Sequence, residues 1–371
     1  MRIFAIALLA VTSIVGFNAC EDGGKPCTNC PDDDLISGQY NPQPYNLEVP
    51  SFFPEPIIPP DNPLTVEGVE LGRRLFYDKI LSADGTMSCA SCHSPEKSFT
   101  DGNAVSTGIL GLTGRRSSMA IVNLAYNAKG FFWDGRAATL EDQALLPVED
   151  HIELNESWPN VIEKIRNHAD YPLRFRKAFG IDRKSEITKE LAVKAIAQFE
   201  RTFISADSKY DKVVWKNEGW FTDQEERGKM LFFFEESQIV NHPGCSHCHI
   251  AVFFTDNNYK NNGLNEVASL TDFPDLGRGA INGNVYDNGK FRVPTLRNIE
   301  LTAPYMHDGR FQTLEQVLEH YSTGGHGVEN EDVNIRPFPL TEQDKQDLIA
   351  FMKTLTDTSF VNNPAFSDPF K

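Results

Sequence analysis

The chain reads Cys-Ala-Ser-Cys-His at residues 89–93 and Cys-Ser-His-Cys-His at residues 245–249. Two thiols at positions i and i+3 can add across the two vinyl groups of one haem, and the histidine that follows can bind the iron. With this composition, about 0.003 runs of this kind are expected by chance. We therefore predict two covalently bound c-type haems rather than zinc or disulfide motifs. The attaching residues would be Cys89, Cys92, Cys245 and Cys248.

Both stretches lie within copies of one longer pattern. A glycine precedes the first cysteine by 17 residues in each copy, at Gly72 and at Gly228. Each motif is followed by Phe-Thr-Asp and then by Asp-Gly-Arg-x-x-Thr-Leu-Glu, at residues 99–101, 134–141, 254–256 and 308–315. Three features in the same order indicate an internal duplication. We predict two cytochrome c-like haem domains, an N-terminal one at residues 64–205 and a C-terminal one at residues 206–371.

The periodicity between the motifs is mostly helical. Apolar residues share one helical face at Leu191, Ala195, Ile196, Phe199 and Phe203. Threonine opens two further helices as an N-cap, at Thr313 and Thr341. Alternation typical of strands is scarce, and 26 glycines with 22 prolines favour long irregular connections. The predicted class is mainly α.

The N-terminus has the pattern of an export signal at residues 1–19. Arg2 supplies a positive start, and the apolar run that follows is too short to span a membrane comfortably. A small residue before Cys20 indicates lipidation of that cysteine, although the residues before it depart from the usual pattern. Residues 20–63 are rich in Pro, Asp and Asn and predict an extended tether. We expect a lipoprotein on the periplasmic side of a bacterial envelope.

Charge narrows the choice of partners. The formal net charge of -17 disfavours nucleic acid and anionic membrane surfaces as partners. An acidic surface suits a basic partner such as a small cytochrome, but many exported proteins are acidic without having such a partner. The membrane contact that we expect is therefore limited to the lipid at Cys20.

Function depends on the sixth position of each iron. A second protein ligand makes an electron carrier, whereas an open position lets peroxide or oxygen bind. No histidine occurs between His93 and His151, and Met119 lies among small apolar residues typical of a core. The sequence favours an open first haem, although a distant residue could still close it.

Several stretches carry a family resemblance: Gly-Arg-Arg-Leu-Phe-Tyr-Asp at 72–78, Phe-Phe-Trp-Asp-Gly-Arg at 131–136, Pro-Thr-Leu-Arg-Asn at 294–298 and Thr-Ala-Pro-Tyr at 302–305. Together with the first haem motif, they resemble the bacterial dihaem cytochrome c peroxidases and the MauG-like enzymes of the same superfamily. The resemblance covers roughly residues 60–357. It implies that His93 and His249 are the proximal iron ligands. It also implies that Trp133 lies between the haems and helps to carry electrons.

The resemblance further implies a polar pocket on the open side of the first haem. Gln143 and Glu153 match the distal residues of the family, with Pro147 between them. A carboxylate there can take a proton from one peroxide oxygen and return it to the leaving oxygen. From the residues alone, Glu149 or His151 could be confused with Glu153.

Two departures bear on the haem ligands. Tyr321 stands where the standard peroxidases carry methionine and the MauG-like enzymes carry tyrosine, so the resemblance implies that Tyr321 is the sixth ligand of the second haem. Met306 is the alternative. The standard peroxidases also have a blocking histidine in the loop that here reads Ile-Leu-Gly at residues 109–111. Its replacement implies activity without prior reduction.

A calcium ion between the haems is a further family feature. Its carbonyl ligands would be Thr302 and Pro304, but Ser117 stands where the family has asparagine. Because serine is a weaker oxygen ligand than asparagine, this departure disfavours calcium binding without excluding it.

The leading hypothesis is a peroxidase that reduces hydrogen peroxide with electrons from a cytochrome or another redox donor. The second hypothesis is a MauG-like enzyme that oxidises side chains of a partner protein. The third is a dihaem electron carrier without peroxide chemistry, which would need two six-coordinate haems.

Overall fold

The structure, a computed structural model, describes residues 21–22, 25–26, 34–233 and 244–371. The mainly helical class is confirmed. The helices are α1 (Val66–Tyr77), α2 (Leu140–Glu149), α3 (Trp158–Asn167), α4 (Tyr171–Phe179), α5 (Lys189–Arg201), α6 (Lys209–Val214), α7 (Asp223–Phe233), α8 (Gly279–Asn282), α9 (Leu314–Thr323), α10 (Glu342–Lys353) and α11 (Thr358–Val361). The strands are β1 (Glu21–Asp22), β2 (Lys25–Pro26), β3 (Tyr259–Lys260) and β4 (Phe291–Arg292). The predicted signal peptide and Cys20 lie outside the described residues.

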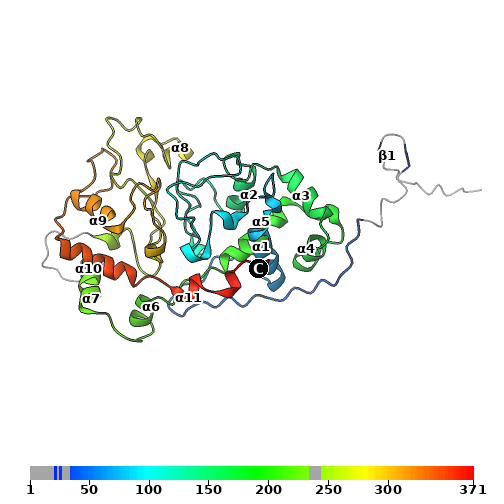
Figure 1. Cartoon of the computed structure of the whole chain (residues 1–371), viewed down its shortest axis with the longest axis horizontal. Helices are drawn as coiled ribbons and strands as arrows, with labels where there is room; N and C mark the ends of the chain where they lie inside the picture. The colour runs from blue at the N-terminus through cyan, green and yellow to red at the C-terminus, as the bar shows by residue number, and fades with distance from the viewer. Residues whose placement is uncertain (1–20, 23–24, 27–33, 234–243) are drawn as a thin grey trace, which may run out of the picture.

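Each half of the molecule is organised around one close crossing of two helices. Helix α1 packs on α5 in the first half, and α7 packs on α10 in the second (Figure 1). A Cβ atom on Gly72 would lie 1.9 Å from the carbonyl oxygen of Ala195, and one on Gly228 would lie 1.9 Å from that of Asp347. The two glycines that the sequence pattern pairs therefore allow the same backbone contact in both halves.

The haem motifs pack against these crossings. Each forms a single turn of 3₁₀ helix, at Cys89–Ser91 and at Cys245–His247, and these turns contact α1 and α7 respectively. Cys89 packs on the core of the first half, and Cys245 packs on the core of the second. The helix crossing therefore positions the cysteines.

The connection between the halves is held by one buried carboxylate. Asp357 is only 1% exposed. Its Oδ2 atom accepts hydrogen bonds of 2.9 Å from the backbone N–H groups of Ala206 and Asp207, and one of 3.1 Å from the Ser205 hydroxyl. The segment that enters the second half is thus tied to the segment that leaves it.

After α10 the chain returns to the first half (Figure 1). Phe360 lies 5.7 Å from Phe99, and Phe366 lies 4.9 Å from Phe203, both measured between ring centroids. The C-terminal residues therefore complete a core that begins near residue 69.

Residues 34–63, the described part of the predicted tether, run extended along both halves (Figure 1). Phe52 stacks on Trp215 at 5.5 Å, while Phe53 packs against Tyr126 and Phe253 at 5.3 and 4.8 Å. These aromatic contacts hold the segment against the body of the protein, so this part of it is not a free spacer.

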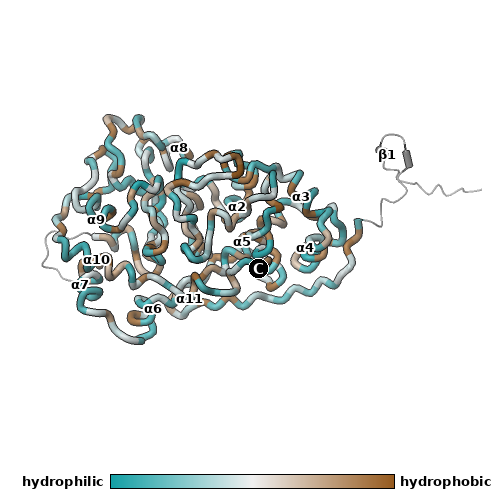
Figure 2. The backbone as a smooth tube through the Cα atoms, in the orientation of Figure 1, coloured by the Kyte–Doolittle hydropathy of each residue, from teal (hydrophilic) through white to brown (hydrophobic). Residues whose placement is uncertain are grey.

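Hydrophilic and apolar residues alternate along the chain, as expected of amphipathic helices (Figure 2). In the described ranges, we find no helix with the length and hydropathy needed to cross a membrane.

Adding a methyl group at either crossing should destabilise the protein. We expect Gly72→Ala and Gly228→Ala each to lower the free energy of unfolding by about 1–3 kcal/mol, because the helices must separate to admit the new atom. Thermal and chemical denaturation of the haem-loaded chain would measure this. Gly114→Ala is the control, since its Cβ would meet its nearest neighbour at 3.7 Å. Equal stability of the three variants would contradict the close contact.

Candidate active site

The first half encloses a cavity of ≈ 550 Å³. Its wall includes the first haem motif, through Cys89, Cys92 and His93, and also Gln143 and Glu153. This size is within the range of about 300–1,000 Å³ that is usual for ligand and cofactor sites. The structure thus brings the predicted attachment residues and the predicted polar residues around one space.

The first motif presents its histidine in the form that a metal needs. The His93 ring lies with Nδ1 2.7 Å from the carbonyl oxygen of Phe99, which fixes the proton on Nδ1 and leaves Nε2 as the free donor atom. Burial lowers the pKa of His93, which favours the neutral ring. Cys89 and Cys92 are free thiols beside it.

The second motif repeats this arrangement. Nδ1 of His249 lies 3.1 Å from the carbonyl oxygen of Phe254, and burial lowers the pKa of this histidine as well. Cys245 and Cys248 are also free thiols. His247 lies between the two cysteines, and its Nδ1 contacts the carbonyl oxygen of Gly244 at 2.9 Å. The Nδ1 atom of His247 is therefore hydrogen-bonded to the backbone of the same 3₁₀ turn.

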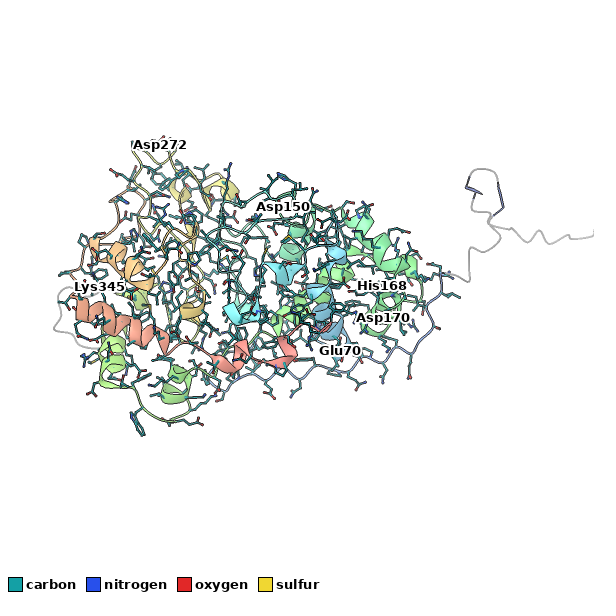
Figure 3. The ribbon with its side chains drawn as sticks, in the orientation of Figure 1. Glu70, Asp150, His168, Asp170, Asp272 and Lys345 are labelled. Atoms are coloured by element: carbon teal, nitrogen blue, oxygen red, sulfur yellow. The ribbon has the colours of Figure 1, made fainter. Side chains whose placement is uncertain are left out.

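Glu153 is a partly buried acid with a strongly perturbed pKa. Burial, helped by the negative charge of Asp150, raises its pKa to about 7, and Arg136 opposes the shift. Asp150 lies at the end of α2 (Figure 3). A carboxyl that titrates near neutrality can both accept and donate a proton under physiological conditions.

The loop at residues 108–109 lies against the backbone around Glu153 and holds it in place. The N–H of Ile109 donates to the carbonyl oxygen of Glu153 at 3.1 Å. A Cβ on Gly108 would lie 1.8 Å from the carbonyl oxygen of Ile152, so the loop can close this tightly only with glycine there. Gln143 and Pro147 reach the same cavity from α2.

Trp133 lies in the wall of this cavity and of a second, smaller one. Its indole Nε1 donates to the carbonyl oxygen of Ser117 at 2.9 Å, and its own carbonyl oxygen accepts from the N–H of Arg292 at 2.7 Å. Asp134 next to it pairs with Arg116, which also pairs with Asp275. The tryptophan is therefore fixed where the two halves meet.

The second cavity, of ≈ 90 Å³, lies between the halves and we call it the inter-unit cavity. It is lined by the three residues of the predicted calcium site, Ser117, Thr302 and Pro304. The Ser117 hydroxyl already donates to the carbonyl oxygen of Met306 at 3.0 Å. In the described part of the chain, no three or more His, Cys, Asp or Glu side chains form a metal-binding group, so the calcium prediction depends on backbone oxygens.

Both candidates for the sixth ligand of the second haem converge on one amide. Asn262 Nδ2 donates to the hydroxyl oxygen of Tyr321 at 3.3 Å and to the sulfur of Met306 at 3.4 Å. Burial raises the pKa of Tyr321 to about 12, and the hydrogen bond from Asn262 opposes the shift. The structure brings both candidates together and does not choose between them.

Three buried groups in or near the walls of these cavities were not predicted from the sequence. Glu200 and Arg292 line the first cavity, and each has a side-chain atom without a hydrogen-bond partner in the described structure. His307 stacks on Phe291 with ring centroids 3.6 Å apart and lies 6.5 Å from Trp133. Aligning the two Asp-Gly-Arg segments would have found it, because His307 occupies the position equivalent to Trp133.

These observations fit a haem in the first half. Free cysteines at the right spacing, a neutral histidine with Nε2 available and a cavity of cofactor size are the groups that covalent attachment requires. The unpartnered guanidinium nitrogen of Arg292 adds a buried cation in the wall, as an acidic cofactor would need.

Comparisons with known proteins agree with this chemistry. A family model described as di-haem cytochrome c peroxidase matches residues 66–219. Methylamine utilization protein MauG of Methylorubrum extorquens is 36% identical over 304 residues, which cover 80% of each chain. Cytochrome c551 peroxidase of Nitrosomonas europaea is 34% identical over 294 residues, covering 79% of this chain and 81% of its own. A solved MauG-like protein associated with microbial copper homeostasis has a TM-score of 0.81 at 37% identity, covering 88% of this chain and 100% of its own.

Removing one pair of cysteines should remove one haem. We expect the matured chain to carry two covalent haems, and the double variant Cys89→Ala, Cys92→Ala to lose the mass of one, because a haem without thioether bonds is released on denaturation. Intact-protein mass spectrometry measures this. His247→Ala is the control and should keep both. Loss of neither haem in the double variant would contradict the assignment.

Proposed function

The chain belongs to the di-haem cytochrome c peroxidase family, and we infer from this that it reduces hydrogen peroxide to water with electrons from a small cytochrome or a similar donor. It is an oxidoreductase that uses two c-type haems. The observation that carries the proposal for its active site is the partly buried Glu153 in the cavity wall, whose pKa of about 7 suits proton transfer to and from a peroxide in that cavity.

In this proposal the protein supplies protons and positions groups. A bound haem supplies the iron and the electrons that break the peroxide O–O bond. The Glu153 carboxylate accepts the proton from one peroxide oxygen and returns it to the other, so that the departing oxygen leaves as water. The Gln143 amide, on the same wall, can orient the peroxide by hydrogen bonding. His93 and His249 would bind the two irons through Nε2.

Trp133 is proposed to lie on the electron route between the two centres. Its position in the walls of both cavities supports this role, as do the hydrogen bonds that hold its indole and its backbone. The hydrogen bond from the indole to the carbonyl oxygen of Ser117 fixes the orientation of the ring in this structure.

The finer assignments extend the proposal. We propose that residues 64–205 form the peroxidatic unit and that residues 206–371 form the electron-transfer unit. The separate apolar cores and the repeated glycine crossings support this division. We also propose export to the periplasm with a lipid anchor at Cys20, for which the sequence at the N-terminus is the support. Calcium held by the carbonyls of Thr302 and Pro304 remains a proposal of the same kind.

One observation favours a second candidate function, the oxidation of side chains in a partner protein. The loop at residues 109–111 has no histidine, and two relatives at 36 and 37% identity carry the name MauG or MauG-like. Steady-state assays with peroxide and reduced cytochrome separate the two functions. Rapid turnover supports the peroxidase, whereas fast reaction with peroxide but no cytochrome oxidation supports the second candidate.

The pH dependence of the peroxide reaction tests Glu153. In the fully ferric protein we expect the bimolecular rate constant to rise with pH through about 7, because only the ionised carboxylate can accept the peroxide proton. Asp150→Asn removes a charge that raises the pKa of Glu153, so the inflection should move to lower pH. Glu153→Gln should lower the rate by about 10²–10⁴-fold and abolish the inflection. Stopped-flow absorbance measures all three.

The exposed neighbour Glu149 supplies the matched control. Glu149→Gln removes a carboxylate from the C-terminal end of α2. It should leave the bimolecular rate constant and the pH of its inflection unchanged. An unaltered pH profile in Glu153→Gln would exclude Glu153 as the proton acceptor. No reaction with peroxide until one-electron reduction would show that another residue blocks the first haem.

Tyr321 is our proposed sixth ligand of the second haem, with Met306 as the alternative. We expect Tyr321→Phe to change the ferric optical and electron paramagnetic resonance spectra of one haem and to raise its midpoint potential, because a phenolate favours oxidised iron. Tyr305→Phe is the matched control, since that hydroxyl contacts the carbonyl oxygen of Ile299. Spectral change in Met306→Leu, with none in Tyr321→Phe, would assign the thioether instead.

A further inference from the structure

Arg292 is a buried cation without a counter-charge. The residue is 7% exposed on strand β4. Its Nη1 and Nη2 atoms make only long contacts of 3.4 Å, to the Asn257 side-chain oxygen and to the sulfur of Met119. Its Nε atom has no hydrogen-bond partner, and none of the ion pairs among the described residues includes it. Burial lowers the pKa of Arg292 to about 10, which indicates how poorly the charge is compensated.

The other buried arginines show how this fold normally treats such a charge. Arg297 is fully buried and forms two 2.8 Å hydrogen bonds with Asp211. Arg201 is 5% exposed and forms hydrogen bonds of 2.6 and 2.8 Å with the two carboxylate oxygens of Glu141. A buried arginine without a partner is costly, so the missing anion must come from a group that the chain binds.

The position of Arg292 identifies that group. Its side chain lines the cavity of the first half, together with Cys89, Cys92 and His93, and it also lines the inter-unit cavity. A haem attached at these cysteines brings propionate carboxylates into the same space, and planar guanidinium groups pair with carboxylates through parallel hydrogen bonds. We propose that Arg292 binds a propionate of the first haem.

This contact would tie the cofactor to the electron route. The backbone N–H of Arg292 donates to the carbonyl oxygen of Trp133 at 2.7 Å, so the residue proposed to hold the propionate is hydrogen-bonded to the tryptophan. Phe291, the preceding residue, stacks on His307. Arg292 is thus a positioning residue that fixes the haem edge beside Trp133 and sets the local charge.

The test compares Arg292→Met and Arg292→Lys with Arg336→Gln in the full chain carrying both haems. Arg336 is exposed and belongs to the lining of neither cavity, so its replacement removes one positive charge away from the site. Two readouts are independent of turnover. They are the midpoint potential of each haem in a spectroelectrochemical titration and the propionate bending band in the resonance Raman spectrum.

We expect Arg292→Met to shift the propionate band and to lower the midpoint potential of the haem attached at Cys89 and Cys92, because a nearby positive charge favours the reduced iron. Arg292→Lys keeps the charge but loses the planar fork, so it should shift the band and change the potential less. If Arg292→Met does not fold, the propionate band of Arg292→Lys alone tests the proposal. Arg336→Gln should change neither readout.

An unchanged propionate band in both Arg292 variants would overturn the proposal. A midpoint potential that follows chloride concentration in the unaltered protein would also overturn it, because the partner would then be a small free anion. The inference rests on the haem attachment of the proposed function but not on peroxide chemistry. Haem content and peroxide turnover, measured on the same samples, therefore separate a failure of this inference from a failure of the proposed function.

Discussion

The close packing of two helix pairs depends on glycine, which has no side chain, at one position in each half of the protein. Helix α1 crosses α5, and α7 crosses α10, at distances that leave no room for a Cβ on Gly72 or Gly228. Each crossing supports the turn that carries a haem motif, so the cysteines are positioned by a backbone contact and not by flexible side chains. Van der Waals contact between backbones is short-ranged and stiff. The proposed attachment cysteines are therefore positioned by contacts between helix backbones.

Local chemistry explains which features could be predicted from the sequence. Short sequence patterns predict the haem motifs, the helical class and the residues around the first cavity. In each of these cases the relevant groups are close in the sequence or repeat at a fixed spacing. Contacts between single aromatic residues that are far apart in the sequence could not be predicted. Phe53 was placed in a tether because its partners, Tyr126 and Phe253, are remote in the sequence. Arg292 gave no signal either, since a buried arginine without a partner looks like any other arginine in a sequence.

Burial, and not net charge, sets the chemistry of the site. The formal charge of -17 describes the surface, whereas the groups that matter at the cavity are few and poorly solvated. Burial moves the pKa of Glu153 up and the pKa values of His93 and His249 down. Both shifts favour the neutral form of the group. The upward shift gives Glu153 a pKa near neutral pH, and the downward shifts leave His93 and His249 as neutral imidazoles, the form that binds metal. Burial alone thus gives the proposed proton-transfer group and the two proposed iron ligands the protonation states that their roles require.

The path of the chain between the halves has a mechanical consequence. Because Asp357 joins the entry of the second half to its exit, and because the C-terminal residues return to the first half, the second half is topologically an insertion clamped at its neck. The halves are also joined directly, by the ion pair between Arg116 and Asp275 and by the hydrogen bond from Arg292 to Trp133, and the aromatic contacts of Phe52 and Phe53 brace them on one side. If each half binds a haem as proposed, these contacts hold the two haems at one spacing. Electron tunnelling, which depends steeply on distance, would proceed across a gap of nearly constant width.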